Sequence, residues 1–376
     1  MARAGQVASD GSGRLAYGIA AGILTWAFPP SLVDEVVAAA GRTEQRSRSL
    51  SARTMVYHAL AMWMYPSSGY EEVMRRLMLG LSRKHHWADD WRMPSPSALT
   101  QARQRLGPAP LRLLFRAVAP TVSGLALPGA LEPIALDTLT LGLPDTPANR
   151  EHFGACPRVR VTALGHCGTQ AVLDAALTAP SAGEGGPARD LLPSLGKGAL
   201  LLAELDTLSV DLWRRAAAAG ADLLWRAGPD WDLPVDRVLP DGSYLSRLAE
   251  PDAGAAAEPP VPVRVITYAD CGGAVDRLIT SVLAPADAAA TRLIHAHHTR
   301  WRLTDTLGDL APGGPSRIDV LRSRSPELVE QEIWAMLLMH HAVRGLLVDP
   351  RDLDGRAAAE LAALVRTVRM IAPDCL

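Results

Sequence analysis

Two acidic residues lie within or directly after apolar segments that are typical of buried strands. Asp137 lies within ALDTLTL, and Glu204 follows the segment ALLLA at residues 199–203. A buried carboxylate is costly unless it is paired or hydrogen-bonded. Carboxylate oxygens are also the ligands that Mg²⁺ and Mn²⁺ prefer. Asp137 and Glu204 are therefore candidate metal ligands at the exit of a sheet, and a hydrogen-bonded polar pair is the alternative. Asp206 is either a further oxygen ligand or the N-cap of the next helix.

Histidines are concentrated near the C-terminus. HAHH contains His295, His297 and His298, and MHHA contains His340 and His341. Imidazole serves as a general acid or base near neutral pH and as a metal ligand. The two clusters predict either a new acid–base or metal site, or aromatic side chains that only pack against their neighbours.

The charge of the chain is unevenly distributed, although its formal net charge is only -2. Residues 1–130 contain 15 Arg and Lys against 8 Asp and Glu, whereas residues 131–376 contain 23 against 32. A positive N-terminal region can neutralise phosphates, so DNA is a candidate partner there. The acidic remainder argues against DNA chemistry in the rest of the chain.

The sequence does not predict a membrane span, because no stretch of 18 or more residues lacks both charges and helix breakers. LAYGIAAGILTWAF at residues 15–28 precedes two prolines and lacks a small-residue cleavage pattern, which favours a core helix over a secretory signal. The four cysteines are dispersed without a Cys-x-x-Cys pair. These features favour a cytoplasmic protein with reduced thiols.

The elements that must position these residues change in type along the chain. The first 120 or so residues have helical periodicity, including a face formed by Val33, Val36 and Val37 and a serine-capped helix that ends near Gly107. From about residue 131 the pattern predicts three adjacent strands, followed by the strand at 199–203, a helix from about Ser209 and another strand. Two hairpins and further C-terminal helices, near residues 286–307, 326–347 and 353–371, complete the prediction. This order is typical of an α/β arrangement. Five tryptophans at apolar spacings are predicted to be core residues: Trp26, Trp63, Trp213, Trp225 and Trp334.

Several long segments resemble, in the same order, the transposases of the bacterial insertion sequence four family, of the DDE, RNase H-like class. The segments are GILTWAFPPSLVDEVVAAAGRTEQRSRSLSARTMVYHALAMWM, GYEEVMRRL, PSPSALTQARQRLG, LPDTPAN, AVLDAAL, SYLSRL and SPELVEQEIWAMLL. The resemblance implies an all-helical N-terminal domain at 1–130 and an RNase H-like catalytic core that begins at 131–227. It also implies a β-rich insertion at 228–285 and C-terminal helices at 286–376 that complete the core.

The chemistry implied by the resemblance is phosphoryl transfer on DNA, in which three carboxylates hold two divalent metals. Asp137 occupies the position of the first acid. At the second acid the family pattern is a strand followed by Ala, Asp, Arg and Gly, whereas this chain has LLAELDTL. Glu204 therefore stands where aspartate is expected, and its extra methylene displaces a magnesium ligand unless the backbone compensates.

The third acid of the family is absent. The family signature of Tyr, two residues, Arg, three residues, Glu, six residues and Lys falls on His297, Arg300, Thr304 and Ala311. Thr304 carries no negative charge, and Asp305 points about 100° around the helix from it. Arg300 matches an arginine that contacts DNA phosphate in the family, and pairing with a neighbouring acid is the alternative here. His341, like His297, replaces an expected tyrosine.

The sequence thus predicts a transposase-derived protein with a degenerate triad that is unable to transpose by the two-metal mechanism. It is either decayed or domesticated, and it binds DNA through its basic N-terminal domain. One alternative is an RNase H-like cleft repurposed for a small molecule in a biosynthetic pathway. A second is metal-dependent DNA nicking that uses Asp137, Glu204 and Asp305. No cofactor is expected beyond residual Mg²⁺ or Mn²⁺, and a homodimer is compatible with the sequence.

Overall fold

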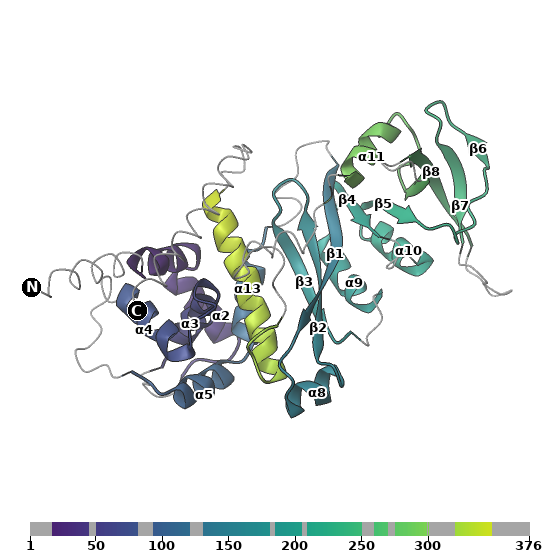
Figure 1. The fold of residues 1–376 in the computed structure, drawn as a ribbon. Helices are drawn as coiled ribbons and strands as arrows, with labels where there is room; N and C mark the ends of the chain where they lie inside the picture. Colours follow the sequence, from purple (N-terminus) through teal and green to yellow (C-terminus); the bar gives the residue numbers. More distant parts are fainter. Residues whose placement is uncertain are drawn as a thin grey trace, which may run out of the picture. The chain divides into compact units, whose positions relative to one another are not determined.

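The computed structural model describes residues 17–44, 50–81, 93–120, 131–180, 185–204, 209–249, 259–269, 275–298, 300 and 320–347. These residues belong to two units. The first unit comprises Met1–Val118, Gly142–Pro157 and Leu307–Leu376, and the second comprises Ala119–Leu141 and Arg158–Thr306. The chain is therefore a mixed α/β protein with a helical N-terminal region and a large sheet (Figure 1).

The first unit is helical. Residues 17–27 form a helix, which is followed by α2 (Pro30–Ala39), α3 (Ala52–Met64), α4 (Tyr70–Leu81), α5 (Pro96–Leu106), α6 (Ala109–Val118), α8 (Pro147–Phe153) and the long α13 (Pro326–Leu347). The predicted face of α2 is confirmed, because Val33, Val36 and Val37 are buried. In Figure 1, α13 runs beside the N-terminal helices, and it contacts α3, α5 and α6.

Side chains at the helix starts explain where several of these helices begin. The side chain of Ser95 accepts a hydrogen bond from the backbone N–H of Ala98, which confirms the predicted serine cap of α5. After α5, Gly107 has a φ of 65°, a conformation that glycine adopts without strain. Thr146 caps α8 in the same way and is followed by Pro147.

Buried polar contacts join the N-terminal helices to α13 within the first unit. The Arg103 guanidinium is fully buried and donates to the side-chain oxygen of Gln331 at 2.8 Å. The Gln331 amide donates in return to the backbone oxygens of Arg103 and Gly107. Trp63 donates its indole N–H to the backbone oxygen of Glu332 at 2.8 Å. The N-terminal helices and α13 therefore share one core.

One of the five predicted core tryptophans is not a core residue. Trp63, Trp213, Trp225 and Trp334 are buried, but 59% of Trp26 is exposed. The helix at 17–27 buries the face that carries Tyr17, Ala20, Ala21 and Leu24, and Trp26 lies on the opposite face. The prediction was wrong because the segment is apolar on all sides and its sequence does not mark which face is covered.

The second unit is built on a nine-stranded sheet with the order β3-β2-β1-β4-β5-β9-β8-β7-β6. The strands are β1 (Glu132–Gly142), β2 (Arg158–His166), β3 (Val172–Thr178), β4 (Ala199–Ala203), β5 (Asp222–Ala227), β6 (Arg237–Val238), β7 (Tyr244–Leu248), β8 (Val261–Ala269) and β9 (Val275–Thr280). β1, β4 and β5 are parallel neighbours, whereas β5 and β9 are antiparallel. The two predicted hairpins are confirmed as β6–β7 and β8–β9.

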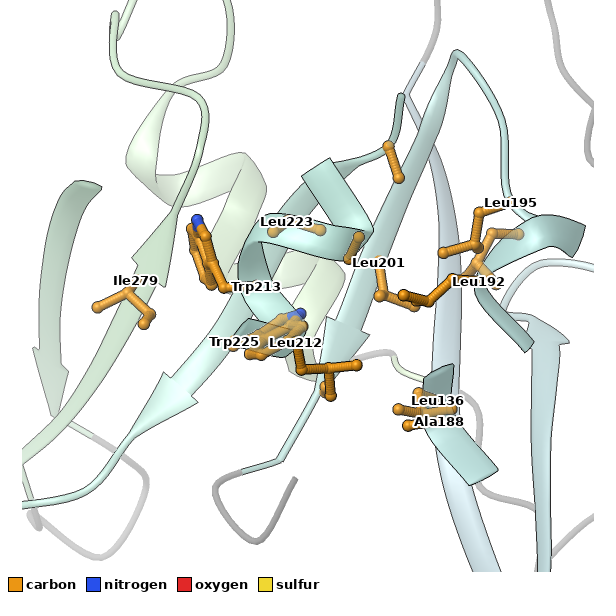
Figure 2. Close-up of a cluster of buried hydrophobic side chains, with 14 of the residues drawn as sticks. Leu136, Ala188, Leu192, Leu195, Leu201, Leu212, Trp213, Leu223, Trp225 and Ile279 are labelled. Atoms are coloured by element: carbon orange, nitrogen blue, oxygen red, sulfur yellow. The ribbon is translucent and has the colours of Figure 1, made fainter. Parts of the chain in front are cut away.

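One face of this sheet is covered by α9 (Gly185–Leu191), the short 3-10 helix η1 (Leu192–Ser194) and α10 (Val210–Ala218). Figure 2 shows side chains from these helices meeting side chains from the strands. Trp213 of α10 packs edge-on against Trp225 of β5, with ring centroids 5.2 Å apart. Ser209 caps α10 by accepting from the backbone N–H of Leu212, so the expectation that Asp206 is the N-cap was wrong.

The alternation of side chains along each strand defines the opposite face. Ile134, Leu201, Leu223 and Trp225 belong to the core under α9 and α10. Residues at the alternate positions of these strands point away from that core. The alternate positions carry the polar residues of the candidate site, and α11 (Ala290–His298) contributes to the same face.

Candidate functional site

A row of polar residues crosses neighbouring strands on the face opposite α9 and α10. β1 and β4 pair Ala135 with Leu202, so the same register two residues further on brings Asp137 level with Glu204. β4 and β5 pair Ala203 with Trp225, which brings Glu204 level with Arg226 in the same way. The parallel register thus places Asp137, in the middle of β1, next to Glu204, which directly follows β4.

The Glu204 carboxylate is surrounded by positively charged and nitrogen-bearing groups. One oxygen forms an ion pair with the Arg300 guanidinium. The other oxygen lies 3.7 Å from Nη1 of Arg226. Nε2 of His297 lies 3.9 Å from the oxygen that Arg300 contacts. For Arg300, the structure therefore shows the predicted pairing with a neighbouring acid.

Arg226 is held from its other side by the β8–β9 hairpin. Asp276 of β9 accepts from Nη2 and Nε of Arg226 at 2.7 and 3.2 Å. Tyr268 of β8 donates its hydroxyl to the second oxygen of Asp276 at 3.4 Å. His298 packs edge-on against the Tyr268 ring, with centroids 5.2 Å apart. The hairpin therefore fixes the direction in which Arg226 points.

His297 is the most buried ionisable side chain around Glu204, with 8% of the side chain exposed. Burial, together with the nearby charges of His298 and Arg226, lowers its pKa to about 4. The imidazole is therefore neutral at pH 7. Its Nε2 atom is buried and has no hydrogen-bond partner among the residues that the structure describes.

The N-terminal end of α11 is anchored by a buried arginine. Arg264 of β8 is fully buried and pairs with Asp241. It also donates to the Ser243 hydroxyl and to the backbone oxygen of Ala288, both at 2.8 Å. Asp241 in turn accepts from the backbone N–H of Ala290, the first residue of α11. These contacts fix the helix that brings His297 to Glu204.

The remaining predicted site residues are Asp206, Thr304, Asp305 and His341. Asp206, Thr304 and Asp305 lie outside the described residues. His341 lies on α13 in the first unit, where its ring is 6.5 Å from that of Phe28 and burial lowers its pKa. Apart from the N-cap role of Asp206, which Ser209 takes, the roles predicted for these residues stay predictions.

The described side chains around Glu204 do not fit a divalent cation. Two guanidinium groups contact the carboxylate, and their positive charge opposes a metal at the same oxygens. Within the described ranges, no group of three or more His, Cys, Asp or Glu residues is arranged to hold a metal ion. The chemistry that this set supports is therefore ion pairing and acid–base chemistry.

Sequence reasoning missed Arg226, Asp276 and Tyr268. Arg226 is the only basic residue of the apolar strand β5. A basic residue in an otherwise apolar strand could have marked it as a site residue. The pairing of Asp276 with Tyr268 depends on the hairpin register, which the sequence alone does not fix.

Many arginines of the helical region pair with acids of the same unit. The pairs are Arg53 with Asp34, Arg75 and Arg76 with Glu72, and Arg112 with Glu330. Arg42, Arg105 and Arg116 have no acidic partner among the described residues. Only part of the positive charge counted in the sequence is therefore available to phosphate.

Comparisons with known proteins relate the chain to transposases. Residues 19–116 match the family model described as the insertion element 4 transposase N-terminal. The chain is 26% identical over 343 residues to the transposase InsG for insertion sequence element IS4 of Escherichia coli (strain K12), covering 84% of this chain and 74% of that protein. A cryo-EM structure of a piggyBac transposase synaptic complex with hairpin DNA has a TM-score of 0.42 and 11% identity, covering 94% of this chain and 82% of that one. This structural likeness is too low to carry an argument. None of the described helices is both long and apolar enough to cross a membrane.

Proposed function

Since this chain belongs to the insertion element 4 family of transposases, we propose that it is a transposase-derived protein that no longer performs two-metal DNA transposition. The observation that carries the proposal is the pairing of Glu204 with Arg226 and Arg300. A carboxylate that is neutralised by two guanidinium groups is a poor ligand for the metal that would activate a nucleophile. Thr304, at the third position, adds no negative charge.

The sheet supports an RNase H-like catalytic domain. In the sheet, β1 lies between the antiparallel pair β2–β3 and the parallel strands β4 and β5. Along the chain, α9 lies between β3 and β4, and α10 lies between β4 and β5. Asp137 in the middle of β1 and Glu204 directly after β4 are the residues that the resemblance assigns to the first two acids of that fold. We therefore propose that the catalytic chemistry is lost while an RNase H-like scaffold is kept.

A plasmid-nicking assay tests this proposal. Supercoiled DNA is incubated with the full chain and either Mg²⁺ or Mn²⁺. The fraction of nicked plasmid should be no higher than in a control without protein. The matched variants are Asp137→Ala and Asp145→Ala, because Asp145 is an exposed acid of the first unit. Metal-dependent nicking that disappears in D137A and persists in D145A would show an active site and overturn the proposal.

We also propose that the helical region contacts DNA through arginines that lack an acidic partner. The triple variant R42Q/R105Q/R116Q should weaken binding to random duplex DNA. It should also reduce the slope of log K against log[salt] by up to about 3, since each phosphate contact contributes about 0.9. The control variant R53Q/R75Q/R112Q removes arginines that already have acidic partners, so its effect should be smaller. Equal effects of the two variants in gel-shift titrations would contradict this assignment.

A further inference from the structure

The groups that converge on Glu204 have the composition of a site for an oxyanion. Three side chains approach the Glu204 carboxylate. Arg226 comes from β5, His297 from α11, and Arg300 from just after α11. Arginine presents several N–H donors in a planar fork that matches carboxylate and phosphate groups. In the structure, the carboxylate that fills this place belongs to the protein itself.

Arg226 keeps its orientation through contacts that do not involve Glu204. Asp276 accepts from two of its nitrogen atoms, and Tyr268 supports Asp276 from the next strand. The arginine would therefore remain aimed at the same point if Glu204 moved away. Such preorganisation lowers the cost of binding a ligand.

His297 provides a second sign that this place can hold a ligand. Its side chain is 8% exposed, and its Nε2 atom is buried without a hydrogen-bond partner in the described part of the chain. Leaving a buried polar atom unsatisfied costs free energy. At 3.9 Å, the Glu204 carboxylate is too distant to satisfy this atom. An anion that takes the place of this carboxylate can bring an oxygen atom within hydrogen-bond distance of Nε2.

The exposure of the pair makes exchange feasible. The Glu204 and Arg226 side chains are 35% and 39% exposed. Ion pairs at such exposure contribute little to stability, because water screens them. An external anion can therefore compete with Glu204 for Arg226 without a large loss of folding free energy.

We propose that Arg226 and Arg300 form a binding site for a carboxylate or phosphate group, which the Glu204 side chain occupies in the free protein. A bound anion replaces the Glu204 carboxylate beside the two guanidinium groups, and no metal takes part. Asp137 lies on the β1 side of Glu204 and Arg226 on the β5 side, so the negative charge of a ligand is directed toward Arg226. This inference deepens the proposed function, on which it rests, by naming the ligand class of the same site.

Removing Glu204 should open the site to small anions. The variants are E204A, E204Q, the double variant E204A/R226Q and the surface control E327A. Inorganic phosphate and acetate are titrated by calorimetry in EDTA, after circular dichroism has shown that each variant is folded. We expect E204A to bind at least one of the two anions at least 10-fold more tightly than the wild type and E327A do. E204A/R226Q should lose that gain. E204Q, which keeps the volume but removes the charge, should lie between the wild type and E204A.

The outcome is decisive in either direction. Equal anion affinities of E204A and wild type would overturn the proposal, and so would a gain in E204A that survives the R226Q change. The affinities for three ligands identify the class of anion that the site prefers. Acetate presents a carboxylate, inorganic phosphate presents a free phosphate, and a short single-stranded oligonucleotide presents phosphodiesters. Because EDTA removes divalent metals, metal-dependent nicking would refute the proposed function without deciding this test.

Discussion

His58 shows how strongly the interior of the helical unit changes a single side chain. It lies on α3 and is fully buried, and its Nε2 atom lies 3.0 Å from the backbone oxygen of Tyr70. Burial lowers the pKa of His58 to about 4, which favours the neutral imidazole in the folded state. The unfolded chain, with a histidine pKa near 6.5, binds a proton that the folded chain excludes. The stability from this residue is therefore complete above pH 6.5 and is lost as the pH falls toward 4.

The pH dependence of unfolding tests this conclusion. Between pH 7 and pH 5, wild-type protein should lose about 2 kcal/mol more unfolding free energy than the variant His58→Gln, from the two pKa values above. Glutamine keeps an N–H donor for the Tyr70 oxygen but does not titrate. The measurement is urea unfolding at both pH values. Identical losses in the two proteins would show that His58 does not control the pH response.

At Glu204, the sequence predicted the residue and the strand end but not its contacts. Strand periodicity and the resemblance located Asp137, Glu204 and Arg300. Glu204 and Arg226 are 22 positions apart and meet only because β4 and β5 are parallel neighbours. Asp276 comes from a later hairpin. Contacts of this kind depend on sheet order and register, which a local pattern does not encode.

At the scale of elements, α5 depends on a cap that the sequence already indicated. Ser95→Ala should lower the unfolding free energy by about 1 kcal/mol, because the backbone N–H of Ala98 loses its acceptor. Ser97→Ala is the matched control, since Ser97 is an exposed residue inside the same helix. Alanine has the higher helix propensity there, so S97A should be neutral or slightly stabilising. Chemical denaturation of both variants measures the difference, and equal costs would argue against the cap.

The anchor of α11 was not predicted, because it depends on an arginine inside a strand. Arg264→Met should cost about 3 kcal/mol or more, since it leaves Asp241 without its buried partner. Arg247→Met is the control on the adjacent strand, because the Arg247–Asp236 pair is exposed and should contribute less than about 1 kcal/mol. Thermal unfolding of the two variants ranks these effects. A smaller cost for R264M than for R247M would contradict the anchor.

At the scale of the molecule, the sequence located most helices and strands but not the discontinuity of the units. The helical unit takes residues from the N-terminal region, from Gly142–Pro157 and from the C-terminal region. Long-range partners such as Arg103 and Gln331 have no local signal in the sequence. The small-molecule alternative and the homodimer stay predictions.

A fragment of residues 1–130 should therefore not fold by itself into the native helical unit. It lacks α13, which covers α3 and α6 and supplies Gln331 to Arg103. We expect the isolated fragment to show broad amide resonances and non-cooperative thermal unfolding. Adding a second fragment of residues 307–376 should restore well-dispersed amide resonances and cooperative thermal unfolding. A fragment that is fully folded without its partner would refute the shared core.

The separation of α6 from α13 along the chain also sets an order of events during synthesis. Roughly 200 residues must be translated after the last N-terminal helix before its C-terminal partner leaves the ribosome, which takes tens of seconds at about 5–20 residues per second. Throughout that interval, the surface of α3 that later contacts α13 stays exposed on the nascent chain. The newborn protein therefore passes through a stage at which chaperones and aggregation compete for an apolar surface that the finished molecule conceals.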